Sequence, residues 1–142
     1  MDTKFRLAAL LMMLATHGGI CGEIALADPL TNEPGNPENG RAIVLDPDRG
    51  DCTICHDMPL ANREFHGNLG PTLAGIGSRR SPAEVRLHIV DPKRMNPATT
   101  MPSYLAVEGL HRIDPELRGR SILTPQEIED VVAFLMSLNA AP

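Results

Sequence analysis

The chain carries Cys52-Thr53-Ile54-Cys55-His56 before its midpoint, and this stretch decides how the rest of the sequence is interpreted. On a short helix, positions i, i+3 and i+4 share a face, so two thiols and an imidazole lie together there. Cys52 and Cys55 can then form thioethers to the two vinyl groups of one haem, while His56 lies beneath the ring and ligates the iron. The C-x-x-C-H spacing is typical of covalent c-type haem attachment, and it predicts one haem c in a redox protein.

Three other interpretations of the two motif cysteines are weaker. A zinc ribbon needs a second ligand pair, and the sequence has no other cysteine pair. A thioredoxin-like C-x-x-C accompanies a βαβ pattern, and no such strand alternation is found. A structural cysteine pair is the third alternative, and it leaves the adjacent histidine unexplained.

The first 27 residues have the features of an export signal. Lys4 and Arg6 form a short basic region, and the apolar run over 7–15 is too short to span a bilayer comfortably. Ala25-Leu26-Ala27 supplies a small-x-small cleavage pattern. Residues 1–27 are therefore predicted to be a cleaved signal peptide, and the mature chain to start at Asp28.

Export predicts a periplasmic protein, which suits the motif because bacteria attach c-type haem outside the cytoplasm. Cleavage also removes Cys21, so the mature chain keeps only the two motif cysteines. A lipoprotein would carry a lipid on Cys21 instead, but Ile20 is a poor residue to precede a lipidated cysteine. No transmembrane segment is expected after processing.

Composition limits the remaining function classes. Removing 27 of the 142 residues leaves 115, which suggests one domain. The net charge is −5 with or without the leader, and this argues against a nucleic-acid partner. The mature part holds three aromatic residues, Phe65, Tyr104 and Phe134, which is a thin core for its size. A buried porphyrin would supply the missing apolar mass, so we expect poor folding without haem.

Helix-capping signals predict a small all-α domain over 36–142, preceded by a flexible tail over 28–35. Asn36 and Pro37 are typical of a helix start, and Ser81-Pro82-Ala83-Glu84 is a capping box whose helix should end near Val90. No convincing strand or internal repeat is found.

A second capping box, Thr124-Pro125-Gln126-Glu127, starts a C-terminal helix. Its apolar residues recur at helical spacing, which predicts one buried stripe. The members of the stripe are Ile128, Val131, Val132, Leu135 and Leu138. We expect the stripe to pack on the first helix, with Gly40 permitting a close crossing.

Iron held by His56 needs a second axial ligand or an open site, and that choice separates electron transfer from catalysis. Met101 is favoured, because Pro92, Pro97 and Pro102 stiffen its loop and leave the thioether little entropy to lose. The remaining candidates are Met95, Met136, His66, His88 and His111. His/Met ligation generally raises the potential and closes the iron to small ligands, which suits electron transfer.

The order of motifs after His56 is similar to that of a class I cytochrome c: Gly70-Pro71-x-Leu73-x-Gly75, then a distal methionine, then a terminal helix. The stretches 67–79, 90–97, 100–104 and 121–135 together resemble, more specifically, the SoxX family of small monohaem cytochromes. The resemblance covers roughly residues 50 to 138. In that family the methionine of the Met-Pro-x-Tyr segment is the distal ligand, and it corresponds to Met101 here.

The resemblance implies a heterodimer with a SoxA subunit, in an L-cysteine S-thiosulfotransferase. The chemistry would occur at a cysteine-ligated haem of SoxA, which couples thiosulfate to a carrier cysteine on SoxYZ. The SoxX-like chain, itself non-catalytic, would pass the released electrons to a soluble cytochrome c. After haem attachment the mature chain has no free thiol, which agrees with this division of labour. A free-standing electron carrier and a haem enzyme or gas sensor with an open site are the alternatives.

Two surfaces are candidates for partner contact. The stretch 104–123 is long for a connection and contains several apolar residues, so we expect it to cover the haem and contact SoxA. A basic group near the distal loop either steers docking or is a solvated face. Its members are Arg79, Arg80, Arg86, Lys93 and Arg94.

Overall fold

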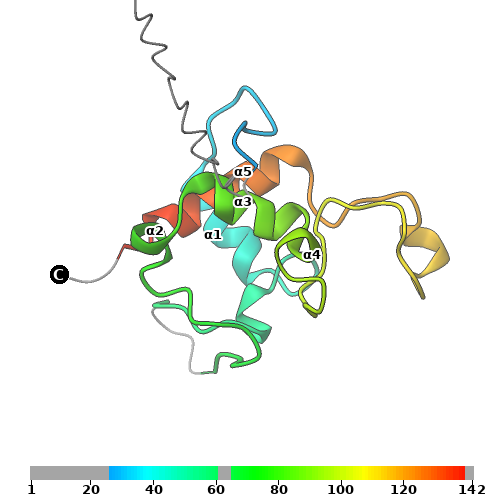
Figure 1. Cartoon of the computed structure of the whole chain (residues 1–142), viewed down its shortest axis with the longest axis horizontal. Helices are drawn as coiled ribbons and strands as arrows, with labels where there is room; N and C mark the ends of the chain where they lie inside the picture. Colours follow the sequence, from blue (N-terminus) through cyan, green and yellow to red (C-terminus); the bar gives the residue numbers. More distant parts are fainter. Residues whose placement is uncertain (1–25, 61–64, 140–142) are drawn as a thin grey trace, which may run out of the picture.

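The computed structural model describes residues 26–60 and 65–139, and within these ranges the secondary structure is entirely helical. Five α-helices and two 3-10 turns follow one another (Figure 1). They are α1 (Pro37–Leu45), η1 (Cys52–Ile54), α2 (Ile76–Arg79), α3 (Pro82–Val90), α4 (Pro92–Met95), η2 (Pro115–Leu117) and α5 (Pro125–Ser137). The all-α prediction is confirmed.

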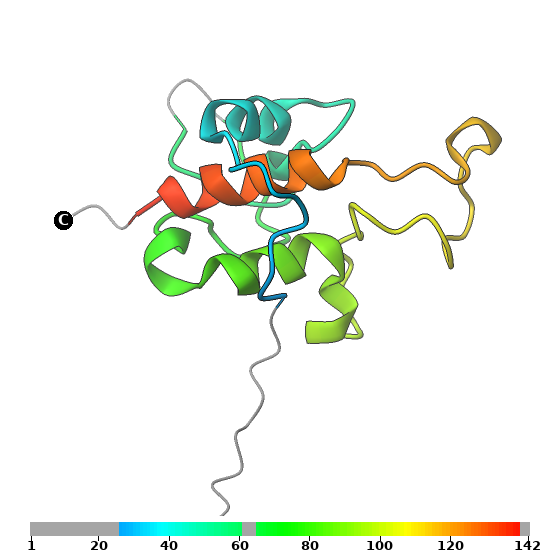
Figure 2. The same cartoon turned by 90° about the horizontal axis from the view of Figure 1, so that it is seen from above.

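Helix α5 is the central element, with α1 on one side of it and α3 on the other (Figure 2). The capping box is present: the Thr124 hydroxyl accepts from the Glu127 N–H, and the Glu127 carboxylate accepts from the Thr124 N–H. The predicted apolar stripe faces the core, and four of its five members are buried. They are Ile128, Val131, Val132 and Leu135.

The crossing of α1 and α5 is the most extensive packing between any two elements. Asn36 caps α1, its side chain accepting from the N–H groups of Glu38 and Asn39. A Cβ on Gly40 would lie 2.0 Å from the carbonyl oxygen of Asp130, so only glycine lets the backbones approach this closely. The predicted role of Gly40 is confirmed.

Helices α3 and α4 form a bent pair ahead of the predicted distal loop. Ser81 and Glu84 form the expected capping box, and α3 ends at Val90. The residue before a proline is disfavoured in helical geometry, so α3 ends before Asp91. Helix α4 then begins at Pro92. The four-residue helices α2 and α4 are too short to produce a periodic signal, and the sequence did not predict them.

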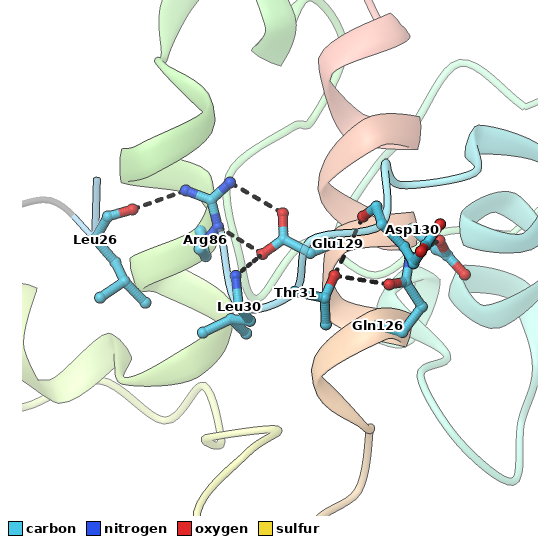
Figure 3. A network of polar contacts seen from close by, with 8 residues as sticks. Leu26, Leu30, Thr31, Arg86, Gln126, Glu129 and Asp130 are labelled. Atoms are coloured by element: carbon cyan, nitrogen blue, oxygen red, sulfur yellow. Dashed lines mark hydrogen bonds and ion pairs between the residues drawn. The ribbon is translucent and has the colours of Figure 1, made fainter. Parts of the chain in front are cut away.

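The N-terminal segment 28–35 crosses α5 and hydrogen-bonds to it (Figure 2). The Leu30 N–H donates to Glu129 at 2.9 Å, and the Thr31 hydroxyl donates to Gln126 at 2.7 Å. Glu129 also accepts two bonds from Arg86 of α3, at 2.7 and 2.9 Å (Figure 3). This buried ion pair therefore joins the segment, for which composition predicts flexibility, to both helices.

The predicted export signal lies outside the described residues, apart from Leu26 and Ala27. The Leu26 carbonyl accepts a hydrogen bond from Arg86 at 2.7 Å (Figure 3). Across the ranges 26–60 and 65–139, every helix is too short or too polar to cross a bilayer.

The segment 105–122 projects from the helical body and carries η2 (Figures 1 and 2). Its backbone takes positive φ angles at Gly109, Arg112 and Gly119, which mark sharp turns. It exposes four large apolar side chains: Val107, Leu110, Leu117 and Ile122. The projection therefore offers apolar surface that the core does not cover.

Candidate haem site

The two motif cysteines and the histidine lie on one tight turn. The Cys55 N–H and the His56 N–H both donate to the Cys52 carbonyl, at 3.2 and 2.9 Å. Beneath the turn, the buried Thr53 hydroxyl donates to the Asp51 carboxylate at 2.5 Å. Both cysteines are half-buried and neither is in a disulfide.

The Cys52 thiol is not the kind of thiol that a redox-active dithiol requires. Burial, and secondly the nearby Asp51 carboxylate, raise the pKa of Cys52 to about 11. A thioredoxin-like site lowers the pKa of its attacking thiol instead. Among the residues that the structure describes, no three His, Cys, Asp or Glu side chains gather as they would around a metal ion.

The His56 ring is oriented by the Gly-Pro loop that follows the motif. Its Nδ1 lies 2.7 Å from the Pro71 carbonyl oxygen. Because a carbonyl oxygen only accepts, Nδ1 carries the proton, and Nε2 keeps its lone pair for an iron ion. A Cβ on Gly70 would lie 2.3 Å from His56 Cε1, so the loop backbone lies directly against the ring.

Further hydrogen bonds hold this loop on the motif. The Gly70 N–H donates to the Cys55 carbonyl and the Gly67 N–H to the Thr53 carbonyl, each at 2.8 Å. From α2, the Arg79 guanidinium donates to two loop carbonyls, those of Thr72 and Ala74. The glycine- and proline-rich stretch is thus a structured loop against the motif.

Met101 is half-buried and packs against the buried apolar side chains of the core, as do Cys52 and Leu73. Its N–H donates to the Thr99 hydroxyl at 3.2 Å, and on its other side the Ser103 hydroxyl donates to the Val90 carbonyl at 2.5 Å. The thioether is therefore held on a loop fixed at both ends. Met136 also packs against the core, from α5.

The histidine candidates have other surroundings. His66 accepts from the Met58 N–H at 2.9 Å, within the loop after the motif. The Nδ1 of His88 lies 2.8 Å from the Glu84 carbonyl of its own helix, and His111 is exposed on the projecting segment. Met95 is half-buried at the end of α4. Of the methionine candidates, Met101 and Met136 pack against the hydrophobic core.

The basic group predicted near the distal loop is only partly a surface feature. Arg86 is 4% exposed and paired with Glu129, so its inclusion in a docking face was wrong. Arg79 is engaged with the loop, and Arg80 bonds Glu84 at 2.7 Å. Lys93 and Arg94 remain exposed on α4.

The residues present fit a covalently attached haem. The donor set matches that of a haem c with His/Met ligation. It consists of two half-buried thiols that are not bonded to each other, an imidazole with its Nε2 lone pair available and a half-buried thioether. Glycines bring the backbone against the motif where a Cβ would clash. Three large apolar side chains, one in the motif and two in the loop after it, offer surface for a porphyrin to cover: Ile54, Leu69 and Phe65, which are 66%, 71% and 83% exposed.

The cytochrome c family model matches residues 37–139, and the chain belongs to this family. With the Cys52–His56 motif, membership gives the chain a covalently bound haem c and the role of an electron carrier.

Among solved structures, a chain of SoxXA from P. pantotrophus is 36% identical, with a TM-score of 0.74 over 81% of this chain and 90% of that chain. The c-type cytochrome SorU from Sinorhizobium meliloti is 24% identical, with a TM-score of 0.46 over 72% of this chain and 90% of that one. The comparison with curated proteins gives no match. The predicted resemblance to SoxX and the class I cytochrome c fold are confirmed.

Proposed function

We propose that the protein is the haem c electron-transfer subunit of a SoxAX-type L-cysteine S-thiosulfotransferase, exported to the periplasm and paired with a SoxA subunit. The observation that carries this proposal is the similarity to a chain of SoxXA, which extends over 90% of that chain at 36% identity. The similarity is thus not restricted to the haem motif.

In this proposal Cys52 and Cys55 form the thioethers, His56 is the proximal ligand and Met101 is the distal ligand. The bound haem supplies one-electron chemistry. The Pro71 carbonyl fixes the tautomer and direction of the His56 ring, which is how an outer partner orients a metal ligand. The fixed loop of Met101 would hold its thioether as the second ligand and exclude small ligands.

The absence of a free thiol in the mature, haem-bound chain assigns the sulfur chemistry to the partner and electron transfer to this subunit. Joining thiosulfate to a cysteine thiol as a disulfide-type S–S bond releases two electrons and the thiol proton. Once both mature cysteines are thioethers, this chain holds no thiol that can form such a bond. The S–S bond therefore forms at SoxA with the SoxYZ carrier cysteine, and this subunit takes the electrons singly and passes them to a soluble cytochrome c.

The projecting segment 105–122 is the part of this proposal that concerns the SoxA contact. Its four exposed apolar residues lie on one excursion from the helical body. We infer that they form a partner-binding surface, since large exposed apolar patches are typical of such surfaces. We expect hydrogen exchange across this segment to slow when SoxA is added, and unchanged exchange would contradict the contact.

Copurification tests the proposed assembly. The tagged chain, purified from thiosulfate-grown cells, should carry with it a larger protein that stains for haem. A double variant on the projection, Leu110→Ser with Leu117→Ser, should lose this partner. A control variant, Asn39→Ser, changes an exposed residue of α1 and should retain it. A wild-type chain that purifies alone would support a free-standing carrier instead.

A further inference from the structure

A hydrogen bond joins the two loops that the proposed ligands occupy. The Tyr104 hydroxyl donates to the Gly50 carbonyl oxygen at 3.2 Å, across 54 positions of sequence. Tyr104 lies three residues after Met101, and Gly50 lies two residues before Cys52. The bond thus links the distal-ligand segment directly to the haem-attachment segment.

The Tyr104 end of this bond is fixed by its own backbone. The Tyr104 N–H donates to the Ile89 carbonyl of α3 at 3.0 Å. Its carbonyl accepts from the Leu123 N–H, just before α5, at 2.9 Å. Tyr104 is therefore the point where the distal segment is joined to α3, to the start of α5 and to the motif.

The Gly50 end is fixed as well. Gly50 is buried, and its N–H donates to the Asp46 carbonyl at 3.1 Å. A Cβ at this position would lie 2.4 Å from the Ile43 carbonyl oxygen, so the residue is pressed against the last turn of α1. A bond between two anchored points resists separation of the loops that carry them.

The phenol is a protonated donor at neutral pH. Burial raises the pKa of Tyr104 well above its ordinary value.

We propose that Tyr104 is a positioning residue, whose bond to Gly50 holds the Met101 segment against the Cys52 segment and so keeps the methionine thioether on the iron. This inference rests on the ligand set of the proposed function. An added ligand can reach the iron only when the Met101 segment moves away, and that movement breaks the bond. Removing the hydroxyl raises the population of the opened form without touching either ligand.

Imidazole binding to the oxidised holoprotein measures this population. The near-infrared sulfur-to-iron charge-transfer band reports the methionine-bound form, and its loss on titration gives the apparent affinity. From the usual contribution of a single hydrogen bond to stability, Tyr104→Phe should bind imidazole about 2- to 10-fold more tightly. The pH at which the band disappears on alkaline titration should fall by about 0.3 to 1 unit, which is the same fold-change on a logarithmic scale.

Thr31→Val is the matched control, because it removes a hydroxyl hydrogen bond between the N-terminal segment and α5. It should leave both readouts at their wild-type values. An unchanged affinity in Tyr104→Phe, or an equal shift in Thr31→Val, would overturn the inference.

A third variant separates this inference from the proposed function. If the band is absent from Met101→Ala but Tyr104→Phe behaves as the wild type, the ligand set stands and only the positioning role fails. If the band persists in Met101→Ala, the ligand set and the positioning role fail together.

Discussion

At the scale of single residues, the His56 ring is the most tightly constrained side chain of the proposed site, since Pro71 fixes its proton and Gly70 its position. A methyl group on residue 70 would lie 2.3 Å from the ring, so the ring or the loop must shift. We expect Gly70→Ala to lower the haem-to-protein ratio several-fold, measured by the pyridine haemochrome spectrum. In Gly109→Asn, where a Cβ meets no atom within 4 Å and Asn tolerates the positive φ, the ratio should be unchanged. Equal ratios in both variants would contradict this account of the loop.

Met101 is the second residue whose role a single substitution can test. Met101→Ala should abolish the near-infrared sulfur-to-iron band and admit carbon monoxide to the reduced iron, because the side chain left cannot ligate. Met95→Ala should retain the band and exclude carbon monoxide. The opposite pattern would transfer the distal role to Met95.

At the scale of the elements, the α1–α5 crossing depends on Gly40. An alanine Cβ would lie 2.0 Å from the Asp130 carbonyl oxygen and 2.9 Å from the Phe134 Cβ, so the helices must separate. Overpacking of this kind costs up to about 3 kcal/mol, which is more than the gain in helix propensity of about 1 kcal/mol. Denaturant unfolding should show a net loss of stability for Gly40→Ala. Asn39→Ala, on the exposed face of the same helix, should be neutral or slightly stabilising. Equal stability of the two variants would argue against the close crossing.

The ion pair between α3 and α5 gives the fold a pH dependence. Burial opposes ionisation of Glu129, but the bonds from Arg86 and the Leu30 N–H outweigh it and lower the pKa of the carboxyl below its ordinary 4.5. A lowered folded-state pKa contributes stability above pH 4.5, and this contribution is lost as the pH falls through the folded-state value. Breaking a buried pair costs about 3–5 kcal/mol, so Glu129→Gln should be less stable than the wild type by this amount at pH 7.

The difference in unfolding free energy between wild type and Glu129→Gln should then shrink as the pH falls below 4.5. Glu38→Gln, on the exposed start of α1, serves as the control, and it should differ little from the wild type at pH 7. A difference for Glu129→Gln that stays constant down to pH 3 would show that the pair does not supply the pH dependence.

At the scale of the whole molecule, the sequence predicted what is encoded locally. Capping boxes four residues long gave the starts of α3 and α5, and Gly40 within an amphipathic stretch indicated the crossing. The contacts of segment 28–35 could not be predicted in this way, because Leu30 and Thr31 bond residues 99 and 95 positions away. Arg86 was placed on a basic surface for the same reason, since its partner Glu129 lies 43 positions away.

The proposed site shows the same limit. Two thioethers and a proximal imidazole need contiguous residues, so the motif alone indicates them. The distal ligand comes from elsewhere in the chain, and the sequence left six candidates. Met101, Cys52 and Leu73 all pack against the hydrophobic core, whereas His66 and His88 make separate hydrogen bonds, and this adds support that the local pattern does not contain.

The most direct test of the central claim is to locate the haem in the chain. The intact protein is extracted with acid and acetone, digested with a protease, and the peptides are analysed by mass spectrometry. We predict that the colour stays with the protein and that one peptide containing both Cys52 and Cys55 carries the added mass of one haem. Haem that passes into the acetone, with an unmodified Cys52–Cys55 peptide, would contradict the account.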